Sequence, residues 1–359
     1  MKLITYDRLY IDKIVRKRSY ETKLGECVKT LPWGVNEHFA EELAKSDCKY
    51  VLLGLPEDIG VRANLGRGGS YSAWQPVLNT FLNTQSNYYF TGEEVLVLGH
   101  IDFSDAMSKA KDLDFHKAED QGKARAIVET IDEAVIPVIK TIAAAGKEAI
   151  IIGGGHNNAY PCIQGSAEGL CLAGKIKTPQ INVINCDAHS DFRPLEGRHS
   201  GNGFSYAFAS GFLNKYGIIG LHESFNPGVV LDELQKRKDR IFFTTFEELY
   251  IREEITFDEA IKKSISFVND DAYIGLEIDL DAIQNIPSSA KTSSGINTIE
   301  ARKFVHQVAT NCKLAYFHIA EAAPLLSHIK TDLKTGKLVS YLITDFIKAR
   351  NTYHANKFV

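Results

Sequence analysis

The stretch Ile181-Asn-Val-Ile-Asn-Cys-Asp-Ala-His-Ser-Asp191 decides the fold, because a short, largely apolar run passes directly into closely spaced polar residues. Such a run predicts a strand that is buried on both faces of a parallel sheet. In these sheets, ligands bind at the carboxyl ends of the strands. Asp187, His189 and Asp191 occupy alternate positions, so their side chains are expected to point the same way at that end of the sheet.

Seven further short runs of apolar residues are distributed along the chain, separated by longer segments with helical spacing. The eight predicted strands are Tyr50–Gly54, Val95–Leu98, Ala149–Ile152, Ile181–Asn185, Tyr216–Ile219, Ile241–Phe243, Tyr273–Ile278 and Leu314–Ala320. This alternation predicts an α/β fold of three layers, with a mostly parallel sheet of about eight strands and helices on both faces. We expect a single domain over residues 1–359, with residues 1–45 as an N-terminal extension packed on it.

Two helices are predicted with definite ends. Apolar residues at helical spacing cover residues 120–145, and Gly146 is the expected C-terminal stop. Pro137 lies inside this helix and predicts a kink or a break. A second helix is expected to begin near Asn297, because Glu300 follows three residues later as in a capping box.

The overall composition is that of a soluble globular protein. A net charge of −4 gives no electrostatic support for binding nucleic acid or an anionic membrane. No stretch approaches the roughly 20 apolar residues that span a bilayer, and the charged N-terminus has no apolar core of a secretory signal. The six cysteines are scattered, as expected for reduced thiols. We therefore expect a cytoplasmic protein that binds neither nucleic acid nor membrane.

Polar residues follow four of the predicted strands and form a charged cluster. Residues 153–158 read Gly-Gly-Gly-His-Asn-Asn, residues 277–281 read Glu-Ile-Asp-Leu-Asp, and Glu321 follows the last strand. Together with residues 187–191, they bring four aspartates to one edge of the sheet, where the carboxylates repel one another and lose hydration. Carboxylate oxygens with one or two imidazoles suit Mn²⁺ and related ions. Two ions about 3.5–4 Å apart can share bridging carboxylates, so the sequence predicts a binuclear metal site.

The order Gly-Gly-x-His, Asp-Ala-His-x-Asp and Asp-x-Asp resembles the signature of the ureohydrolase superfamily, which includes arginase and agmatinase. The resemblance runs from about Val51 to Pro324 and implies an arginase-like fold with two Mn²⁺ ions per chain. It implies that one ion is bound by His156, Asp187, Asp191 and Asp279, and the other by Asp187, His189, Asp279 and Asp281. Asp191 would also accept the proton of a bridging hydroxide, and Glu321 would hold the amidine or guanidinium group of the substrate.

Within this superfamily, three segments resemble the formimidoylglutamase branch. They are the glycine- and arginine-rich loop at residues 60–69, the Asp-Phe-Arg sequence at residues 191–193, and the segment at residues 200–204. The substrate of that branch carries two carboxylates, which arginines bind well through paired hydrogen bonds. The candidate substrate-binding residues, beside Glu321, are Arg62, Arg67 and Arg193, with Asn202 and Asn226 as further candidates.

Several positions depart from the family pattern. Gly155 stands where an acidic residue usually precedes the histidine, and loss of such a partner can weaken metal binding about 10–100-fold. Phe204 replaces a proton-shuttling histidine of arginase, which argues against arginase itself, and Glu277 replaces a small serine. Gln284-Asn285 and Ala323 are further departures. His199 or His222 could relay protons in place of the missing histidine, although the ordinary expectation for each is a histidine at the surface.

The resemblance implies hydrolysis of N-formimidoyl-L-glutamate to L-glutamate and formamide, a step of histidine degradation. A second reading is the release of urea from a guanidino substrate such as arginine or agmatine. A two-metal phosphoesterase would use the same ligand types, but the sequence shows no phosphate-binding loop and Glu321 would repel phosphate. A non-catalytic relative that acts in binding or assembly is a further alternative. Ni²⁺, Co²⁺ or Fe²⁺ could take the place of Mn²⁺, and the family implies a homo-oligomer, a trimer or hexamer.

Overall fold

The structure is a computed structural model that describes residues 1–32, 34, 38–327 and 333–356. Its strands are β1 (Lys2–Thr5), β2 (Tyr50–Gly54), β3 (Val95–Asp102), β4 (Glu148–Ile152), β5 (Ile181–Cys186), β6 (Leu213–Leu221), β7 (Ile241–Thr245), β8 (Ile274–Asp279) and β9 (Leu314–Ala320). Its α-helices are α1 (Arg8–Ile14), α2 (Leu24–Cys27), α3 (Phe39–Lys45), α4 (Ile59–Ala63), α5 (Trp74–Leu82), α6 (Ser104–Ala110), α7 (Ala118–Ala144), α8 (Ala159–Leu172), α9 (Gly203–Ala209), α10 (Gly228–Lys236), α11 (Phe246–Tyr250), α12 (Phe257–Val268), α13 (Thr298–Asn311) and α14 (Leu333–Asn356).

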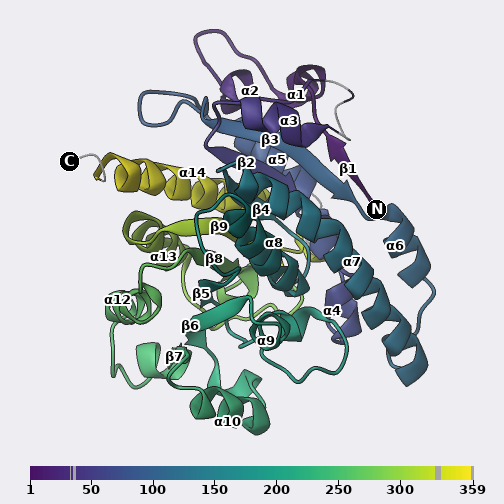
Figure 1. The fold of residues 1–359 in the computed structure, drawn as a ribbon, viewed down its shortest axis with the longest axis vertical. Coiled ribbons are helices and arrows are strands. Elements are labelled where there is room, and N and C mark those ends of the chain that lie inside the picture. The colour runs from purple at the N-terminus through teal and green to yellow at the C-terminus, as the bar shows by residue number, and fades with distance from the viewer. Residues whose placement is uncertain (33, 35–37, 328–332, 357–359) are drawn as a thin grey trace.

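The nine strands form one sheet in the order β1-β3-β2-β4-β9-β8-β5-β6-β7 (Figure 1). Neighbouring strands are parallel except β1, which pairs antiparallel with β3. The predicted fold class and all eight predicted strands are confirmed. Strand β1 was not predicted, because its four residues, Lys-Leu-Ile-Thr, are too short a run to show the apolar pattern of a buried strand.

Helices cover both faces of the sheet, which completes the expected three layers (Figure 1). Buried residues of α5, α12, α13 and α14 pack on one face, and those of α4, α7, α8 and α9 pack on the other. Central strands such as β4, β5 and β9 therefore have apolar side chains on both sides, which explains their continuous apolar runs.

The two predicted helix ends agree with the structure. Gly146 follows α7 with a φ of 72°, a left-handed conformation that glycine adopts without steric cost. Helix α7 continues through Pro137 without a break. The side chain of Asn297 accepts hydrogen bonds at the start of α13, and Glu300 completes the capping box. Among the described residues, none of the helices combines the length and apolarity needed to cross a membrane.

The order of the central strands brings distant segments of the chain together. Strands β4, β9, β8 and β5 are consecutive neighbours in the sheet, although β9 follows β4 along the chain only after four other strands. Because these four strands are parallel, their carboxyl ends lie at the same edge of the sheet. The polar residues that follow them therefore converge at one place.

Candidate metal centre

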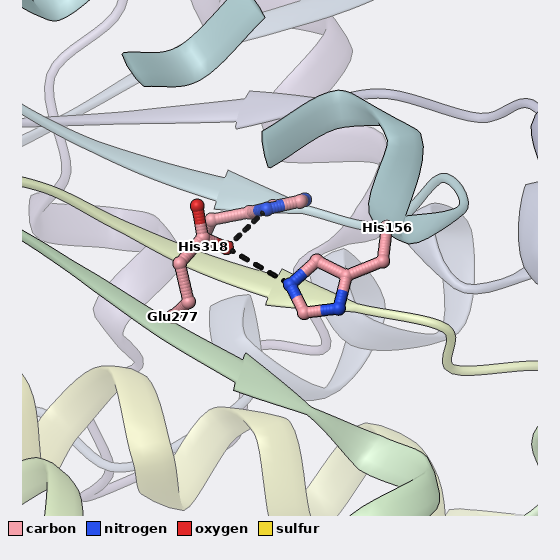
Figure 2. Close-up of side chains that lie close together, drawn as sticks. All are labelled: His156, Glu277 and His318. Carbon is pink, nitrogen blue, oxygen red and sulfur yellow. Dashed lines mark hydrogen bonds and ion pairs between the residues drawn. The ribbon is translucent and has the colours of Figure 1, made fainter. Parts of the chain in front are cut away.

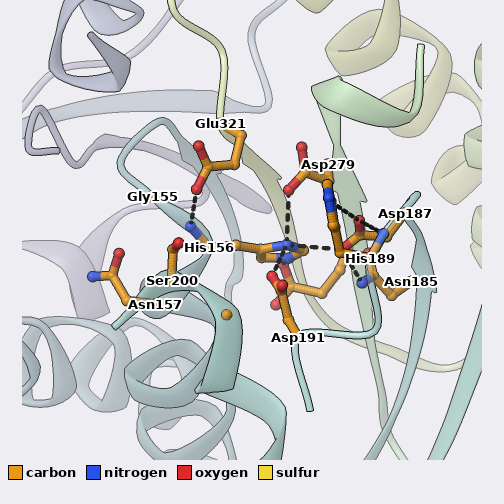
Figure 3. A network of polar contacts seen from close by, with 12 residues as sticks. Gly155, His156, Asn157, Asn185, Asp187, His189, Asp191, Ser200, Asp279 and Glu321 are labelled. Carbon is orange, nitrogen blue, oxygen red and sulfur yellow. Dashed lines mark hydrogen bonds and ion pairs between the residues drawn. The ribbon is translucent and has the colours of Figure 1, made fainter. Parts of the chain in front are cut away.

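The polar cluster at the carboxyl edge of the sheet consists of residues at or just after the ends of β4, β5, β8 and β9 (Figure 3). His156 begins the short 3-10 helix η2 (His156–Asn158) shortly after β4, and Asp187 directly follows β5. Asp279 is the last residue of β8, and Asp281 lies in the 3-10 helix η5 (Leu280–Ala282) that follows. Glu321 directly follows β9. All five side chains are buried.

The first group of donor atoms surrounds the Nδ1 atom of His156. This nitrogen lies 3.1 Å from Asp187 Oδ2, 3.0 Å from Asp191 Oδ2 and 3.1 Å from Asp279 Oδ2. Ligand atoms about 2.1 Å from a common ion and at right angles to each other are roughly 3 Å apart. The four side chains therefore have the spacing of ligands to one ion.

A second group lies beside the first and shares Asp187 with it. The Nδ1 atom of His189 is 3.2 Å from Asp281 Oδ2 and 3.7 Å from Asp187 Oδ1. Asp187 thus presents Oδ2 to the first group and Oδ1 to the second. A carboxylate with one oxygen in each group is what two adjacent ions require of a bridging ligand.

The polar atoms of the cluster are not satisfied by protein groups alone. Neither ring nitrogen of His156 has a hydrogen-bond partner with acceptable geometry among the described residues, and neither does Asp281 Oδ1. Burial, together with the neighbouring aspartates, raises the pKa of Asp279 well above its ordinary value. Burial likewise raises the pKa of Asp281 to about 6. Divalent cations would supply the missing partners and offset the cost of burying these carboxylates.

Two asparagines support the ligands and the segment that carries them, and one of them, Asn185, was not predicted from the sequence. Asn185 donates from Nδ2 to Asp187 Oδ2 at 2.9 Å and also contacts the hydroxyl of Tyr216 at 3.0 Å. Asn226 accepts a hydrogen bond from the backbone N–H of Ser190 at 2.9 Å. Asn185 could have been noticed as a polar residue within a strand that is otherwise apolar and buried.

Glu57 organises the loop that carries His156. Its buried carboxylate accepts hydrogen bonds from the backbone N–H of Gly155 at 3.1 Å and from the side-chain amides of Asn157 and Asn158 at 3.2 and 2.6 Å. Nothing in the sequence pointed to this role, because Glu57 is about a hundred residues away from the loop along the chain.

Two acidic residues of the site adopt left-handed backbone conformations. Asp191 has a φ of 45° and Glu321 a φ of 61°. A non-glycine residue in this region costs about 1–3 kcal/mol, and such residues cluster at functional sites. Glu321 is further fixed by two donors, the backbone N–H of His156 to Oε1 at 2.9 Å and Ser289 Oγ to Oε2 at 2.9 Å. Burial, with Asp279 nearby, raises its pKa to about 8.

The site opens into a cavity of about 230 Å³. Its described lining includes Asn64, His189, Asp191, Arg193, Ser200, Phe225, Asn226, Asp279, Asp281, Ser289 and Glu321. Arg193 is the only arginine or lysine among these lining residues. Its guanidinium lies 3.2 Å from Glu196 Oε1, and its side chain is 43% exposed.

The other predicted substrate-binding residues lie elsewhere and are not among the described lining residues. Arg62 stacks on Phe115 at 4.2 Å and donates to the carbonyl of Ala110 at 3.2 Å. Asn202 is fully buried, and its Oδ1 accepts a hydrogen bond from Arg198 at 2.8 Å. Arg67 is exposed to solvent. The cavity therefore brings together Glu321, Arg193 and the further candidate Asn226, but not Arg62, Arg67 or Asn202.

The two histidines predicted as possible proton relays, His199 and His222, are buried and not at the surface, and neither is among the described cavity-lining residues. Phe204 is fully buried, edge-on to the ring of His156 at 5.1 Å. His199 is also fully buried, with Nδ1 accepting from the N–H of Gly201 at 3.1 Å. His222 is stacked between two aromatic rings, and burial lowers its pKa. In these positions both histidines have structural contacts.

Comparison with known proteins identifies the family and the fold. The family model described as the arginase family matches residues 49–346. Formimidoylglutamase of Streptococcus pyogenes is 25% identical over 319 residues, which cover 85% of this chain and 88% of that protein. The crystal structure of Trypanosoma cruzi formiminoglutamase with Mn²⁺ has a TM-score of 0.68 at 17% identity, covering 92% of this chain and 98% of that one.

Two further solved structures share the fold. Formimidoylglutamase of Bacillus subtilis has a TM-score of 0.68 at 18% identity and covers 94% of each chain. The agmatine ureohydrolase of Thermoplasma volcanium has a TM-score of 0.64 at 19% identity, over 86% of this chain and 92% of that one. Because the family match spans most of the sequence, the chain belongs to the arginase family and is a metal-dependent hydrolase that acts on the C–N bonds of linear amidines.

Proposed function

We propose that this protein is a binuclear manganese hydrolase that converts N-formimidoyl-L-glutamate and water to L-glutamate and formamide. One observation carries the proposal: two groups of metal-binding side chains share Asp187 and open into a cavity that Glu321 also lines. The named relatives support this substrate, because formimidoylglutamases are found among both the sequence matches and the structural matches.

In this proposal, His156, Asp187, Asp191 and Asp279 hold one ion, and Asp187, His189, Asp279 and Asp281 hold the other. Asp187, which has one oxygen in each group, would contribute to both ions, and the family resemblance implies that Asp279 would do so too. A pair of Mn²⁺ ions bound there would lower the pKa of water and supply hydroxide near neutral pH. Asp191 is one of these ligands and also lines the cavity, so its carboxylate would hold the proton of the nucleophile.

Glu321 would orient the cationic amidine through charge-assisted hydrogen bonds. Its two oxygens already accept from the backbone of His156 and from Ser289, so the carboxylate is held before substrate arrives. Burial raises the pKa of Glu321 to about 8. A bound cation would favour the ionised form, which makes this residue selective for positively charged substrate groups.

Arg193 is the candidate for the carboxylate end of the substrate, because it lines the same cavity as Glu321. Ser200, Asn64 and Asn226 add neutral polar groups to the lining. A guanidino substrate with a single carboxylate is the second candidate. It is favoured by the presence of only one arginine or lysine among the described lining residues, whereas formimidoylglutamate carries two carboxylates.

A turnover assay with the purified, Mn²⁺-loaded enzyme tests the proposal. Formimidoylglutamate should yield formamide and glutamate, while arginine and agmatine should yield little urea. Asp279→Ala should abolish turnover, and Arg193→Ala should raise KM more than it lowers kcat if the residue binds the substrate tail. Urea from a guanidino substrate without formamide from formimidoylglutamate would establish the second candidate. Full metal loading without any turnover would contradict both.

A further inference from the structure

A buried glutamate, Glu277, lies beside the ring of His156 (Figure 2). Glu277 is on β8, two residues before Asp279, and its side chain is completely buried. Its Oε2 atom lies 3.4 Å from Nε2 of His156. The opposite ring nitrogen, Nδ1, faces the three aspartates of the first group. His156 therefore lies between the metal position and Glu277.

The loop next to His156 has no space for an acidic side chain of its own. A Cβ atom at Gly155 would lie 2.5 Å from Asn157 Oδ1 and 2.7 Å from Val61 Cγ2, closer than side-chain atoms normally approach. It would also lie 3.3 Å from Glu321 Oε1. An acid that supports His156 in this chain has to come from another element, and Glu277 on the neighbouring part of the sheet provides one.

Glu277 is itself held in a fixed position by two residues of β9. The hydroxyl of Tyr316 donates to Oε1 at 2.7 Å, and Nδ1 of His318 lies 2.6 Å from Oε2. The second ring nitrogen of His318 is 3.3 Å from the carbonyl oxygen of Gly153, in the loop that leads to His156. All three side chains are fully buried, so water does not screen the carboxylate from His156.

We propose that Glu277 is a positioning residue for the metal centre. Its carboxylate favours a proton on Nε2 of His156 and thereby keeps the lone pair of Nδ1 directed at the metal position. Such carboxylate–histidine–metal arrangements fix the tautomer and the ring orientation of the ligand. At 3.4 Å the contact is longer than an ordinary hydrogen bond, so it acts mainly through charge in a buried environment. The inference rests on the metal centre of the proposed function.

An ion bound between His156, Glu277 and His318 is a competing explanation, because their donor atoms lie within 4.8 Å of one another. It would require His156 to bind metal through both nitrogens and to lose both ring protons. The positioning role needs one proton on Nε2 and one ion on Nδ1, which is the ordinary state of a histidine ligand. Measured metal stoichiometry distinguishes the two arrangements.

Metal binding to the Glu277→Gln variant tests the proposal without reference to turnover. Calorimetric titration of metal-free protein with Mn²⁺ should show the ion at His156 bound about 10–100-fold more weakly than in the wild type. The second ion, on His189 and Asp281, should be affected much less. Electron paramagnetic resonance at limiting Mn²⁺ should then show isolated ions in the variant where the wild type shows coupled pairs.

Two further variants separate positioning from simple structural support. Glu148→Gln removes another largely buried carboxylate, paired with Arg350 at 2.8 Å at the opposite end of β4, and should lower the melting temperature without changing Mn²⁺ affinity. Tyr316→Phe keeps the charge of Glu277 but removes one of its donors, and should weaken the same ion by a smaller factor. It also serves as the test if Glu277→Gln does not fold.

The outcomes distinguish this inference from the metal centre on which it depends. A wild type that binds fewer than two ions would refute the centre itself. A wild type with two ions, and Glu277 or Tyr316 variants whose Mn²⁺ affinity stays within about twofold, would refute only the positioning role. A third ion that disappears in Glu277→Gln would also overturn it, in favour of the competing ion site.

Discussion

His199 should make the protein lose stability in mild acid, because its ring is buried in the neutral form. The imidazole is fully buried, Nδ1 accepts a hydrogen bond from Gly201, and Nε2 lies 3.1 Å from Glu196 Oε1. Burial, followed by the positive charge of Arg125, lowers the pKa of His199 from 6.5 to about 4. The unfolded chain therefore binds this proton at a higher pH than the folded chain does.

The magnitude follows from that difference in pKa. Between pH 6.5 and pH 4 the unfolded state holds more protons, so the free energy of unfolding falls as the pH falls. At about 1.4 kcal/mol for each pKa unit, His199 alone should remove about 2 kcal/mol by pH 5 and about 3 kcal/mol by pH 4. Above pH 7 its titration should contribute almost nothing.

Urea unfolding at a series of pH values checks this prediction. The protein should be kept metal-free with a chelator, because loss of bound metal in acid would otherwise add its own pH dependence. His199→Asn keeps a side-chain acceptor near Gly201 but cannot titrate, so its stability should fall less steeply between pH 7 and pH 5. His116→Asn changes an exposed histidine and serves as the matched control.

A parallel pH dependence in the wild type and His199→Asn would refute the reasoning. It would mean that the ring is as easily protonated in the folded state as in the unfolded state. His199 would then again be a candidate for proton relay near neutral pH. The predicted difference of about 2 kcal/mol at pH 5 is well above the uncertainty of comparing unfolding midpoints.

Three further predictions concern the metal centre and its support. Asn185→Ala removes the amide that donates to Asp187 at 2.9 Å, and should weaken Mn²⁺ binding about 10–100-fold in a calorimetric titration, whereas unchanged affinity would rule out this role. Arg198→Met leaves Asp132 buried without its partner at 2.8 Å, and should cost about 3–5 kcal/mol in urea unfolding; a loss below about 1 kcal/mol would contradict it. Free Mn²⁺ at about 1,000 times its Kd should stabilise the protein by about 4 kcal/mol, so a chelator should lower the melting temperature. A melting temperature that is the same with Mn²⁺ and with the chelator would contradict the proposed metal centre.

The fold could be predicted from the sequence because buried parallel strands are encoded locally. Each central strand needs apolar side chains on both faces. A run such as Ile181–Asn185 can therefore be predicted as a strand from its own residues, before its neighbouring strands are known. The edge strand β1 has no such requirement, and only its hydrogen bonds to β3 define it. The order of strands in the sheet depends on contacts between distant segments, and no local pattern encodes it.

The candidate site likewise has one part that local sequence predicts and another part that depends on contacts between distant segments. The side chains that converge around Asp187 come from short motifs, in which neighbouring residues must face one position. The group that holds the His156 loop comes from far away in the chain: Glu57 is about a hundred residues before that loop. The arginines of the glycine-rich loop at residues 60–69 could not be assigned to the substrate pocket from the sequence, because the direction of a long side chain depends on packing. Arg62, for example, stacks on Phe115 and does not line the cavity.

The order of the strands has a consequence for how the protein is made. β8 and β9 lie between β4 and β5 in the sheet, yet they are synthesised long after both. Until residues 274–320 have left the ribosome, β4 and β5 are open edges on two separate half-sheets, and the sheet does not yet hold His156 and Asp187 side by side. We therefore expect no fragment that ends before residue 320 to bind either ion with the affinity of the whole chain. Capture of the metal pair is then a late event, which reports that the last two strands have joined the two halves.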